Sequence, residues 1–412
     1  MAKFQQRKKL FLIISLTTNL GLLGVFKYYG FFVDNVILLL TALGLPSFTN
    51  TIEILLPVGI SFYTFQTLSY TIDVYRGRIA TRYDFLDFAL YVAFFPQLVA
   101  GPIERAETLL PQIEKKRTYS AKMTQDAIFL IMWGFFKKLV IADNVAIIVN
   151  MVFALEEPSF YILWAGVFAF SIQVIADFSA YTDIARGSAK FLGFNLMPNF
   201  NHPYLAVSPS DFWRRWHMSL TFWIRDYVFV PITVDLMRNN KTEKYSENLG
   251  VFITFILIGL WHGANWNFVL YGLYHFILFA MFPICGRHVS SGFRNSIIVR
   301  PFRILFMFIL LNIGYLIFRG GELSLIIEYY SLSPFGVSYE ERQMALFLFT
   351  KALLFSVPLW VHTLYAHVRK GVYFQERTYL LTYINILASI IMFLGILIMR
   401  SNTSNDFIYF QF

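Results

Sequence analysis

Runs of mostly apolar residues recur along the chain at the length that a membrane-spanning helix requires. A hydrocarbon core about 30 Å thick is crossed by about 20 mostly apolar residues in a helix. The candidate spans are Leu10–Phe26, Phe31–Leu45, Ile54–Ile72, Phe85–Ala100, Ala127–Phe153, Tyr161–Ala176, Val251–Phe282, Phe302–Phe318, Ala345–Leu364 and Tyr379–Met399. The pattern therefore predicts an all-α polytopic protein of about ten transmembrane helices, with interrupted or re-entrant segments among them.

The composition supports a membrane protein and excludes several other classes. Hydrophobic residues make up 57% of the chain and charged residues 14%, whereas soluble globular proteins carry roughly 45–50% and about 25%. The net charge is +9, and the basic residues are not gathered in one soluble domain. This charge therefore indicates loops that face anionic membrane lipid, and it does not indicate a nucleic-acid partner. Cys285 is the single cysteine, which excludes an intrachain disulfide and a cysteine metal cluster.

The positions of basic residues predict how the chain is oriented in the membrane, and the lack of linkers predicts its domain organisation. Lys3 and the basic run Arg7–Lys9 precede the first span, and no small-residue cleavage site follows it. We therefore expect a retained first helix with its basic end in the cytoplasm. Three further basic loops are predicted on the same side: Arg76–Arg82, Lys115–Arg117 and Arg238–Lys244. Without a linker or a repeat, residues 1–412 are predicted to form a single membrane domain.

Three stretches interrupt the apolar pattern, and the first is Phe94–Arg105 (FFPQLVAGPIER). Pro96, Gly101 and Pro102 follow one another closely there. Two interpretations remain open: a helix end followed by a loop, or irregular backbone at membrane depth. The second arrangement is tolerated only where the backbone is buried in protein or lines a cavity.

The second stretch runs from Asp177 to Pro231 and is expected to begin with an irregular segment. Ser208 is expected to cap a new helix, with a proline at its first turn. Trp213 and His217 would then share one ridge of that helix, with arginines on the neighbouring ridge. An interfacial amphipathic helix explains the tryptophans and arginines, but it leaves a histidine on the apolar ridge unexplained.

The third stretch is Gly259–Gly263 (GLWHG). If one helix runs from Val251, His262 lies roughly 16 Å along it, near the middle of the bilayer. The two glycines are also compatible with simple close approach of two helices. An ionisable group at that depth, beside Asn265 and Asn267, indicates a functional site.

The remaining histidines carry less information. His275 follows on an apolar helix as a candidate core residue, and His202 and His288 lie in loop-like sequence. The HExxH, Walker A, GxGxxG and Gly-x-Ser-x-Gly motifs are all missing from the sequence. The sequence therefore supports neither a metal site nor a serine nucleophile.

Five segments in fixed order resemble the membrane-bound O-acyltransferase family, and specifically its bacterial alginate O-acetyltransferase-like branch. They are SFYTFQTLSYTIDVYRG (Ser61–Gly77), FFPQLVAGPIER (Phe94–Arg105), DFSAYTDIARGSAKFLGF (Asp177–Phe194), NFNHPYLAVSPSDFWRRWHMSLTFWIRDYVFVPI (Asn199–Ile232) and GLWHGANWNFVLYGLYH (Gly259–His275). The teichoic-acid D-alanyl transferase is similar around RWHMSL and WHG. This motif-bearing core covers residues 61–275, the resemblance is loose beyond about residue 320, and helices at about residues 300–400 complete the domain.

The resemblance implies a helical fold around a central funnel or tunnel in the bacterial cytoplasmic (inner) membrane. It implies transfer of an acyl group from acetyl-CoA or another acyl thioester, without a bound cofactor or metal, to hydroxyls of an extracytoplasmic polysaccharide. The catalytic residues of the family match His262 and His217. An extracytoplasmic hydrolase-like partner subunit is also implied, as are further helices before the segment that matches Leu20–Phe32.

The chemistry itself favours histidine. A hydroxyl attacks a thioester slowly unless a base accepts its proton, and such catalysis contributes roughly 10²–10⁴-fold. Which histidine is the base stays open, because the second one could polarise the carbonyl or orient the acceptor. We expect the two imidazoles to lie close together and to face one internal cavity.

Further residues are candidates for contact with the substrates. Tryptophans are expected to wall the tunnel and exclude water: Trp213, Trp216, Trp223, Trp261 and Trp266. Arg214 and Arg215 are expected to meet either the phosphates of an anionic donor or lipid headgroups. Asn265, beside the GLWHG motif, is a further candidate.

Two other classes of protein compete with the acyltransferase interpretation. A transporter or flippase would use interrupted helices as a substrate path, but transporters usually carry paired, symmetry-related broken helices. A structural scaffold would leave the two buried histidines unexplained. The sequence does not identify the acceptor, and alginate, cellulose, peptidoglycan and other glycans all remain open.

Overall fold

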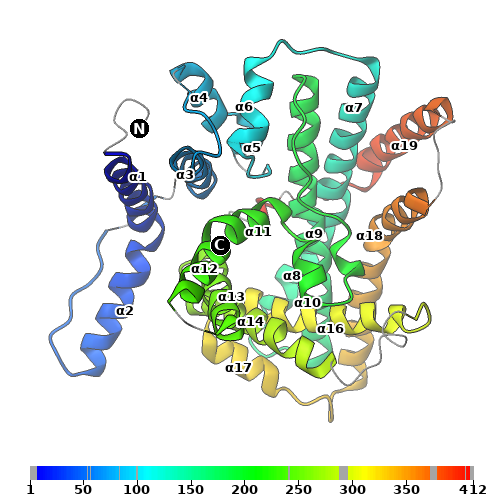
Figure 1. Cartoon of the computed structure of the whole chain (residues 1–412). Helices are drawn as coiled ribbons and strands as arrows, with labels where there is room; N and C mark the ends of the chain where they lie inside the picture. The colour runs from blue at the N-terminus through cyan, green and yellow to red at the C-terminus, as the bar shows by residue number, and fades with distance from the viewer. Residues whose placement is uncertain are drawn as a thin grey trace.

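The computed structural model describes residues 7–52, 54, 55, 57–82, 84–98, 101–239, 242–286, 296–371, 378–403 and 405–408. Throughout these residues the regular elements are helices, and no β-strand occurs among them (Figure 1). The predicted all-α class is confirmed. Several residues used in the sequence predictions lie outside the described set: Lys3, Val99, Ala100, Lys241 and His288.

The first half of the chain contains α1 (Lys8–Leu23), the π-helix η2 (Gly24–Tyr28), α2 (Tyr29–Ala42), α3 (Ile60–Arg76), α4 (Phe85–Val92), α5 (Phe95–Leu98), α6 (Ala106–Glu114), α7 (Ala121–Phe136), the π-helix η3 (Lys137–Ala142), α8 (Asp143–Phe153) and α9 (Phe160–Phe191). The second half contains the 3₁₀-helix η4 (Pro203–Leu205), α10 (Pro209–Trp213), α11 (Met218–Ile224), the π-helix η5 (Arg225–Phe229), α12 (Val230–Arg238), α13 (Glu243–His262), α14 (Trp266–Gly286), α16 (Arg300–Arg319), α17 (Leu323–Ser331), α18 (Tyr339–Gly371) and α19 (Thr378–Met399).

Local sequence explains where several of these helices begin and end. Asp84, Ser120, Ser208 and Thr242 precede α4, α7, α10 and α13, and each side chain accepts a backbone N–H of the first turn. Such caps satisfy donors that have no partner inside the helix. Gly77 ends α3 in the left-handed conformation, with φ 71°, which glycine adopts without strain.

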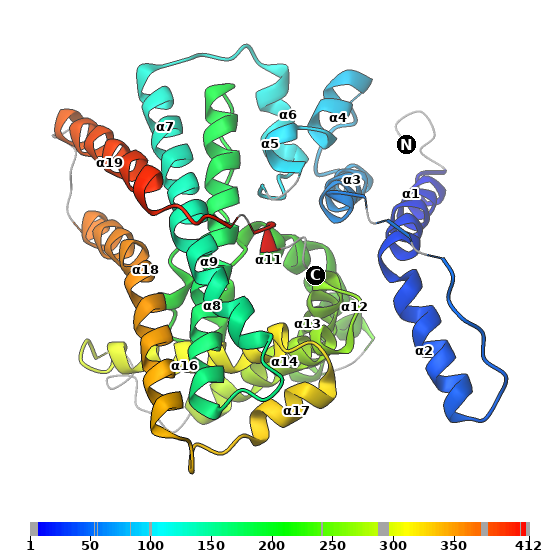
Figure 2. The ribbon, with the colours of Figure 1, turned by 180° about the vertical axis from the view of Figure 1, so that it is seen from behind.

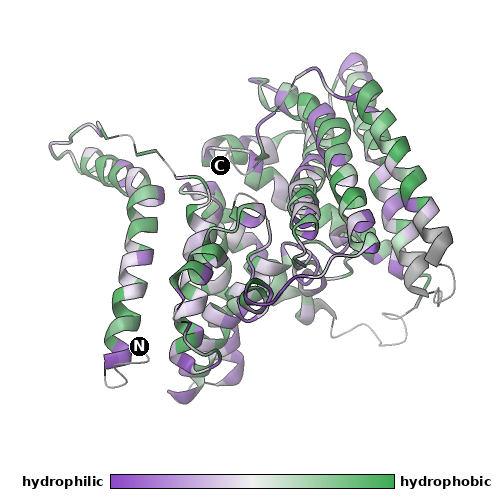
Figure 3. Cartoon of the chain, turned by 90° about the horizontal axis from the view of Figure 1, so that it is seen from above, coloured by the Kyte–Doolittle hydropathy of each residue, from purple (hydrophilic) through white to green (hydrophobic). Residues whose placement is uncertain are grey.

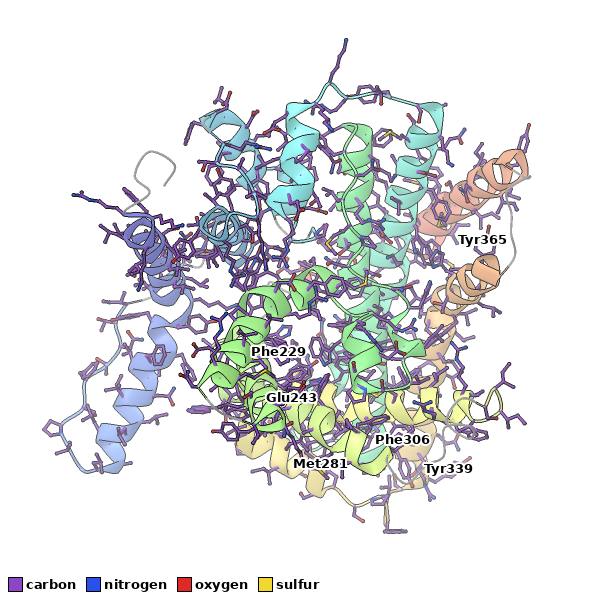
Figure 4. The ribbon with its side chains drawn as sticks, viewed as in Figure 1. Phe229, Glu243, Met281, Phe306, Tyr339 and Tyr365 are labelled. Atoms are coloured by element: carbon purple, nitrogen blue, oxygen red, sulfur yellow. The ribbon has the colours of Figure 1, made fainter. Side chains whose placement is uncertain are left out.

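Helix α9 is the central element of the bundle. Helices α7, α8 and α18 pack along it, and they surround it in both views of the ribbon (Figures 1 and 2). Within its most apolar 18-residue window, 78% of the residues are buried inside the protein. Buried apolar side chains of α9, α11, α13 and α14 belong to one hydrophobic core, and Figure 4 draws the side chains of these helices as sticks.

Five helical segments in the described part of the chain are long and apolar enough to cross a membrane. They are Lys8–Ala42, Phe160–Phe191, Trp266–Ile284, Arg300–Arg319 and Tyr339–Ala366. The outer helices also expose large apolar side chains, such as Leu38 on α2 and Ile398 on α19, which are 66% and 81% exposed. Hydrophobic residues also make up much of the helical ribbon in Figure 3, as expected of helices that meet lipid.

Several predicted boundaries were wrong. The two runs Leu10–Phe26 and Phe31–Leu45 form one continuous helical stretch through η2. Within the described residues 85–98, the predicted span is divided between α4 and α5. Pro96 lies in the first turn of α5, where its missing N–H costs no helical hydrogen bond.

The segment that begins at Asp177 was expected to be irregular, and this prediction was wrong. It continues α9 without a break, because lysines of η3 pair with its carboxylates inside the bundle. Lys138 Nζ lies 3.0 Å from the Asp177 carboxylate, and Lys137 Nζ lies 2.7 Å from that of Asp183. Paired charges can be buried at much lower cost than isolated ones.

The predicted single span Val251–Phe282 was also wrong, since it forms the antiparallel helices α13 and α14 with a turn at residues 263–265. Close packing of this pair requires glycine. A Cβ atom on Gly259 would lie 2.1 Å from the carbonyl oxygen of Phe268. Residues Val251 to His262 do lie in one helix, α13, so the distance of roughly 16 Å along it stands, and the depth of His262 in the bilayer stays a prediction.

The stretch Phe94–Arg105 is packed into the protein. Gln97 in α5 is buried, and a Cβ atom on Gly101 would lie 2.4 Å from the Cα of Gln97. The N–H of Ile103 donates to Ser219 Oγ at 3.0 Å. The described residues of this stretch are thus a short helix, α5, and irregular backbone at residues 101–105, which contacts the start of α11. Both interpretations stay open, because they differ in membrane depth.

Candidate active site

His262 is the last residue of α13 and is 7% exposed. Its imidazole is surrounded by aromatic rings, with centres at 5.0 Å for Trp261, 5.1 Å for Phe318 and 6.0 Å for Tyr271. The position at a helix end follows from the turn after it, where Gly263 has an extended backbone with φ −168°.

A small cavity lies against His262. Its volume is about 10 Å³, which is about the room that one water molecule requires. It is lined by Val174, Trp216, His262, Tyr271, Tyr315, Phe318 and Ile408. Trp216 was predicted to line the substrate path, whereas Tyr271, Tyr315, Phe318 and Ile408 were not identified from sequence.

His217 is fully buried, at 0% exposure, and lies between α10 and α11. The continuous helix predicted from Ser208 through His217 is therefore wrong, although Ser208 does cap its first turn. The new helix α11 is held at its start by Asn199. The Asn199 carbonyl accepts the N–H of Met218 at 2.9 Å, and its side chain accepts the hydroxyl of Ser219 at 2.6 Å.

The backbone of His217 is strained. Its φ of 40° lies in the left-handed region, and His202 is the other non-glycine residue with positive φ in the described chain. Such conformations cost of order 1–3 kcal/mol and persist where the surroundings impose them, often at active sites. The strain is thus an observation, independent of the sequence motif, that directs attention to His217.

Trp261 brings the two histidines together. Its ring centre lies 5.5 Å from that of His217 and 5.0 Å from that of His262, which bounds the separation of the imidazole centres at 10.5 Å. The predicted proximity is confirmed. The predicted shared cavity is not borne out, because His262 lines it and His217 is not among its lining residues, although the chain neighbour Trp216 is.

The turn that carries His262 is held from a distant part of the chain. Because α13 ends at His262, the carbonyls of Leu260 and Trp261 have no partner within the helix. Tyr28 Oη donates to the first at 2.9 Å, and Lys27 Nζ donates to the second. Sequence analysis missed this role of Lys27 and Tyr28, whose only signal is polarity between two apolar runs.

Other predicted residues lie away from the cavity. Trp213 is buried against His275, with ring centres 5.1 Å apart, and Arg215 pairs with Asp211 at 2.9 Å. Arg214 and Asn265 are exposed. Nothing in the structure tests contact between the arginines and a donor, so that role stays a prediction.

The other tryptophans and His275 have structural contacts. Trp223 donates to the carbonyl of Phe65 at 3.0 Å. Trp266 is 49% exposed and donates to Asn35 Oδ1 at 2.8 Å, so its role as the wall of an internal path stays a prediction. His275 is 1% exposed among aromatic rings, and its predicted place in the core is confirmed.

A second, larger cavity of about 120 Å³ is lined by residues of the loop 198–205 and of α7, α9 and α18. Its wall includes Lys137, Asp183 and Arg186 as well as aromatic residues. Tyr204 from this cavity meets Tyr315 from the His262 cavity, with the hydroxyls 3.2 Å apart. The two cavities are thus separated by a hydrogen-bonded pair of tyrosines.

His202 and His362 both line this second cavity, with ring centres 6.0 Å apart. In the described part of the chain, no group of three or more histidine, cysteine, aspartate or glutamate residues is arranged to hold a metal ion.

The sequence profile of the membrane-bound O-acyltransferase family matches residues 76–318, which is more than half of the chain. The chain belongs to the membrane-bound O-acyltransferase family. The matched region contains His217, Trp261 and His262, whereas Lys27 and Ile408 lie outside it.

Within this family the chain is similar to several bacterial proteins. It is 38% identical over 326 residues to the probable alginate O-acetylase of Pseudomonas aeruginosa, covering 79% of this chain and 60% of that protein. It is 33% identical over 344 residues to the peptidoglycan O-acetyltransferase of Helicobacter pylori, covering 77% and 63%. It is 31% identical over 227 residues to the teichoic acid D-alanyltransferase of Bacillus subtilis, covering 54% and 57%. The chain thus spans less than two thirds of the length of these relatives.

Proposed function

We propose that the protein is a membrane O-acetyltransferase of the bacterial inner membrane. It moves an acetyl group from a cytoplasmic thioester donor, such as acetyl-CoA, to hydroxyls of an extracytoplasmic polysaccharide. The observation that carries the proposal is the pair of buried histidines that both contact the Trp261 ring, of which His262 lines a cavity. Two of its relatives are named a probable alginate O-acetylase and a peptidoglycan O-acetyltransferase, and these names support the choice of acyl group and acceptor class.

His262 is proposed as the general base because its side chain lines the cavity. The acceptor hydroxyl oxygen attacks the thioester carbonyl carbon while His262 takes the hydroxyl proton. The carbon–sulfur bond then breaks, the ester bond remains, and the proton passes from His262 to the departing sulfur, which leaves as a thiol. The balance requires neither a metal nor an oxidant, and the base contributes roughly 10²–10⁴-fold.

His217 is proposed to serve the same reaction from its place against the Trp261 ring, by orienting the thioester or the acceptor. Burial among Phe178 and Trp261, at 4.8 and 5.5 Å between ring centres, holds its imidazole in one place. Holding the reacting groups in a fixed orientation can lower the activation free energy substantially. The aromatic walls exclude water that would otherwise hydrolyse the thioester.

The route of the donor is the finer part of the proposal. The cavity at His262 has room for about one water molecule, so the site opens before a thioester enters. We propose a central tunnel within a bundle of about ten spans, with the Tyr204–Tyr315 contact as a place where the two cavities join. Arg214 and Arg215 remain candidates for donor phosphates, and a hydrolase-like subunit outside the membrane remains a candidate partner.

Acetyl esters on envelope glycans test the proposal. Cells with the wild-type chain, without it, or with His262→Gln are grown, and ester-linked acetyl groups are released by mild alkali and quantified by mass spectrometry. We expect the esters to be lost in the second and third strains. His275→Gln, which removes a buried imidazole outside the cavity, is the matched control and keeps them.

Equal acetyl content in all strains would contradict the proposal. Accumulation of unmodified glycan precursor inside the cells, with normal acetylation of what is exported, would favour the transporter interpretation instead.

A further inference from the structure

The segment after α19 returns to the interior of the protein. Figure 2 shows it crossing from the end of α19 past α7 and α8 towards α11. Phe407 and Ile408 are each 1% exposed, although they follow an irregular stretch. Apolar residues this deeply buried usually belong to helices of the core. Because Phe407 and Ile408 lie outside such a helix, other contacts anchor their backbone in place.

Charged residues supply the anchors. The N–H of Ile408 donates to the Asp177 carboxylate at 2.7 Å, and Lys138 Nζ donates to the carbonyl of Asn405 at 2.8 Å. Lys138 also pairs with Asp143 at 2.9 Å and with Asp177 at 3.0 Å. Two buried carboxylates thus share one ammonium group, and the Ile408 amide satisfies a remaining carboxylate oxygen.

The anchored segment touches the surroundings of both histidines. Ile408 lines the cavity that His262 lines. The ring of Phe407 lies 4.1 Å from that of Tyr181 and 6.0 Å from that of Phe178, between centres. Phe178 in turn meets His217 edge-on at 4.8 Å.

We propose that Ile408 is a specificity-determining residue that limits the transferred group to acetyl. The inference rests on the proposed function, because the acyl group must enter the space beside His262 for its carbonyl to react there. That space has room for about one water molecule, so it widens even for an acetyl group, and each further methylene of a longer acyl chain requires the wall to move further. The aromatic members of the wall are large and rigid, whereas the Ile408 side chain is aliphatic and can be shortened without removing a ring.

Shortening Ile408 should therefore admit a longer acyl chain. Membrane vesicles from the source cells, carrying the full chain, receive S-acetyl- or S-butyryl-N-acetylcysteamine, and mass spectrometry counts the esters formed on envelope glycan. We expect the wild type to prefer acetyl over butyryl by about 100-fold, since one methylene in a fitted pocket changes rates by about 10–200-fold. Ile408→Ala, which removes three side-chain carbons, should reduce that preference at least tenfold through a higher butyryl rate.

Two further variants make the result specific. Ile408→Val perturbs packing less and should improve propionyl transfer, which keeps the test valid where Ile408→Ala fails to fold. Ile148→Ala shortens another buried isoleucine, 1% exposed on α8 and not among the cavity residues, and should leave the preference unchanged.

The outcomes separate this inference from the proposed function. Acetyl transfer with an unchanged preference in both Ile408 variants would overturn the inference alone. An equal change in Ile148→Ala would also overturn it, because general loosening would then explain the result. A wild-type chain that forms no acyl ester would remove the proposed function and this inference with it.

Discussion

His262→Ala abolishes acyl transfer while the protein stays folded in the membrane. Loss of the general base is expected to slow the reaction roughly 10²–10⁴-fold. Removing the buried side chain leaves a cavity, at a cost of about 2–5 kcal/mol for a large side chain, and it leaves no unpaired charge. The measurement is acetyl transfer by the purified chain in vesicles, normalised to folded protein by size-exclusion chromatography in detergent.

His262→Gln distinguishes a chemical role from a structural one. Glutamine restores part of the volume and some hydrogen bonding, but its amide does not accept the proton. We expect it to be as inactive as His262→Ala and more stable. A glutamine variant with near-normal turnover would exclude His262 as the base and leave His217 as the candidate.

His217→Gly keeps the turn between α10 and α11 and loses the reaction. Glycine adopts the observed φ of 40° without the strain that other residues carry there, whereas His217→Ala keeps the strain and also lacks the imidazole. We expect both variants to transfer acetyl groups at least about tenfold more slowly than the wild type, since binding geometry depends on fixed orientation. Glycine should be the more stable of the two in thermal unfolding.

If the acetyl-transfer rates of the variants rank in the order of their thermal stability, the proposed role of His217 in the reaction would be contradicted. If His217 only shapes the turn, His217→Gly and the left-handed-tolerant His217→Asn should both approach wild-type rates. Rates measured alongside melting temperatures in the same vesicles separate the two cases.

Apolar patterning predicted the helices well where packing is simple and poorly where charges are paired. The runs that became α16 and α19 were placed within a few residues, because uninterrupted apolar sequence leaves no other regular structure in lipid. The continuation of α9 past Asp177 was missed, because its partner Lys138 lies on another helix. The division of α13 from α14 was missed because apolar composition continues through the turn.

Some features of the candidate site were likewise predictable from the sequence, and others were not. His262 and His217 were found from their motifs and from the rarity of ionisable groups in apolar sequence. The left-handed turn at His217 and the clamp by Lys27 and Tyr28 depend on tertiary contacts with no local signature. Ile408 is indistinguishable from any other apolar residue until the chain is folded.

A double-variant cycle tests most directly whether the two histidines serve one acyl transfer. Single-turnover release of thiol from radiolabelled S-acetyl-N-acetylcysteamine is measured in vesicles for the wild type, His217→Asn, His262→Gln and the double variant. Loss of catalytic groups commonly leaves a residual rate from binding alone, and groups that act as a unit show non-additive losses. The account predicts a double variant about as slow as His262→Gln alone. Losses that multiply, or a near-normal rate in either single variant, would contradict it.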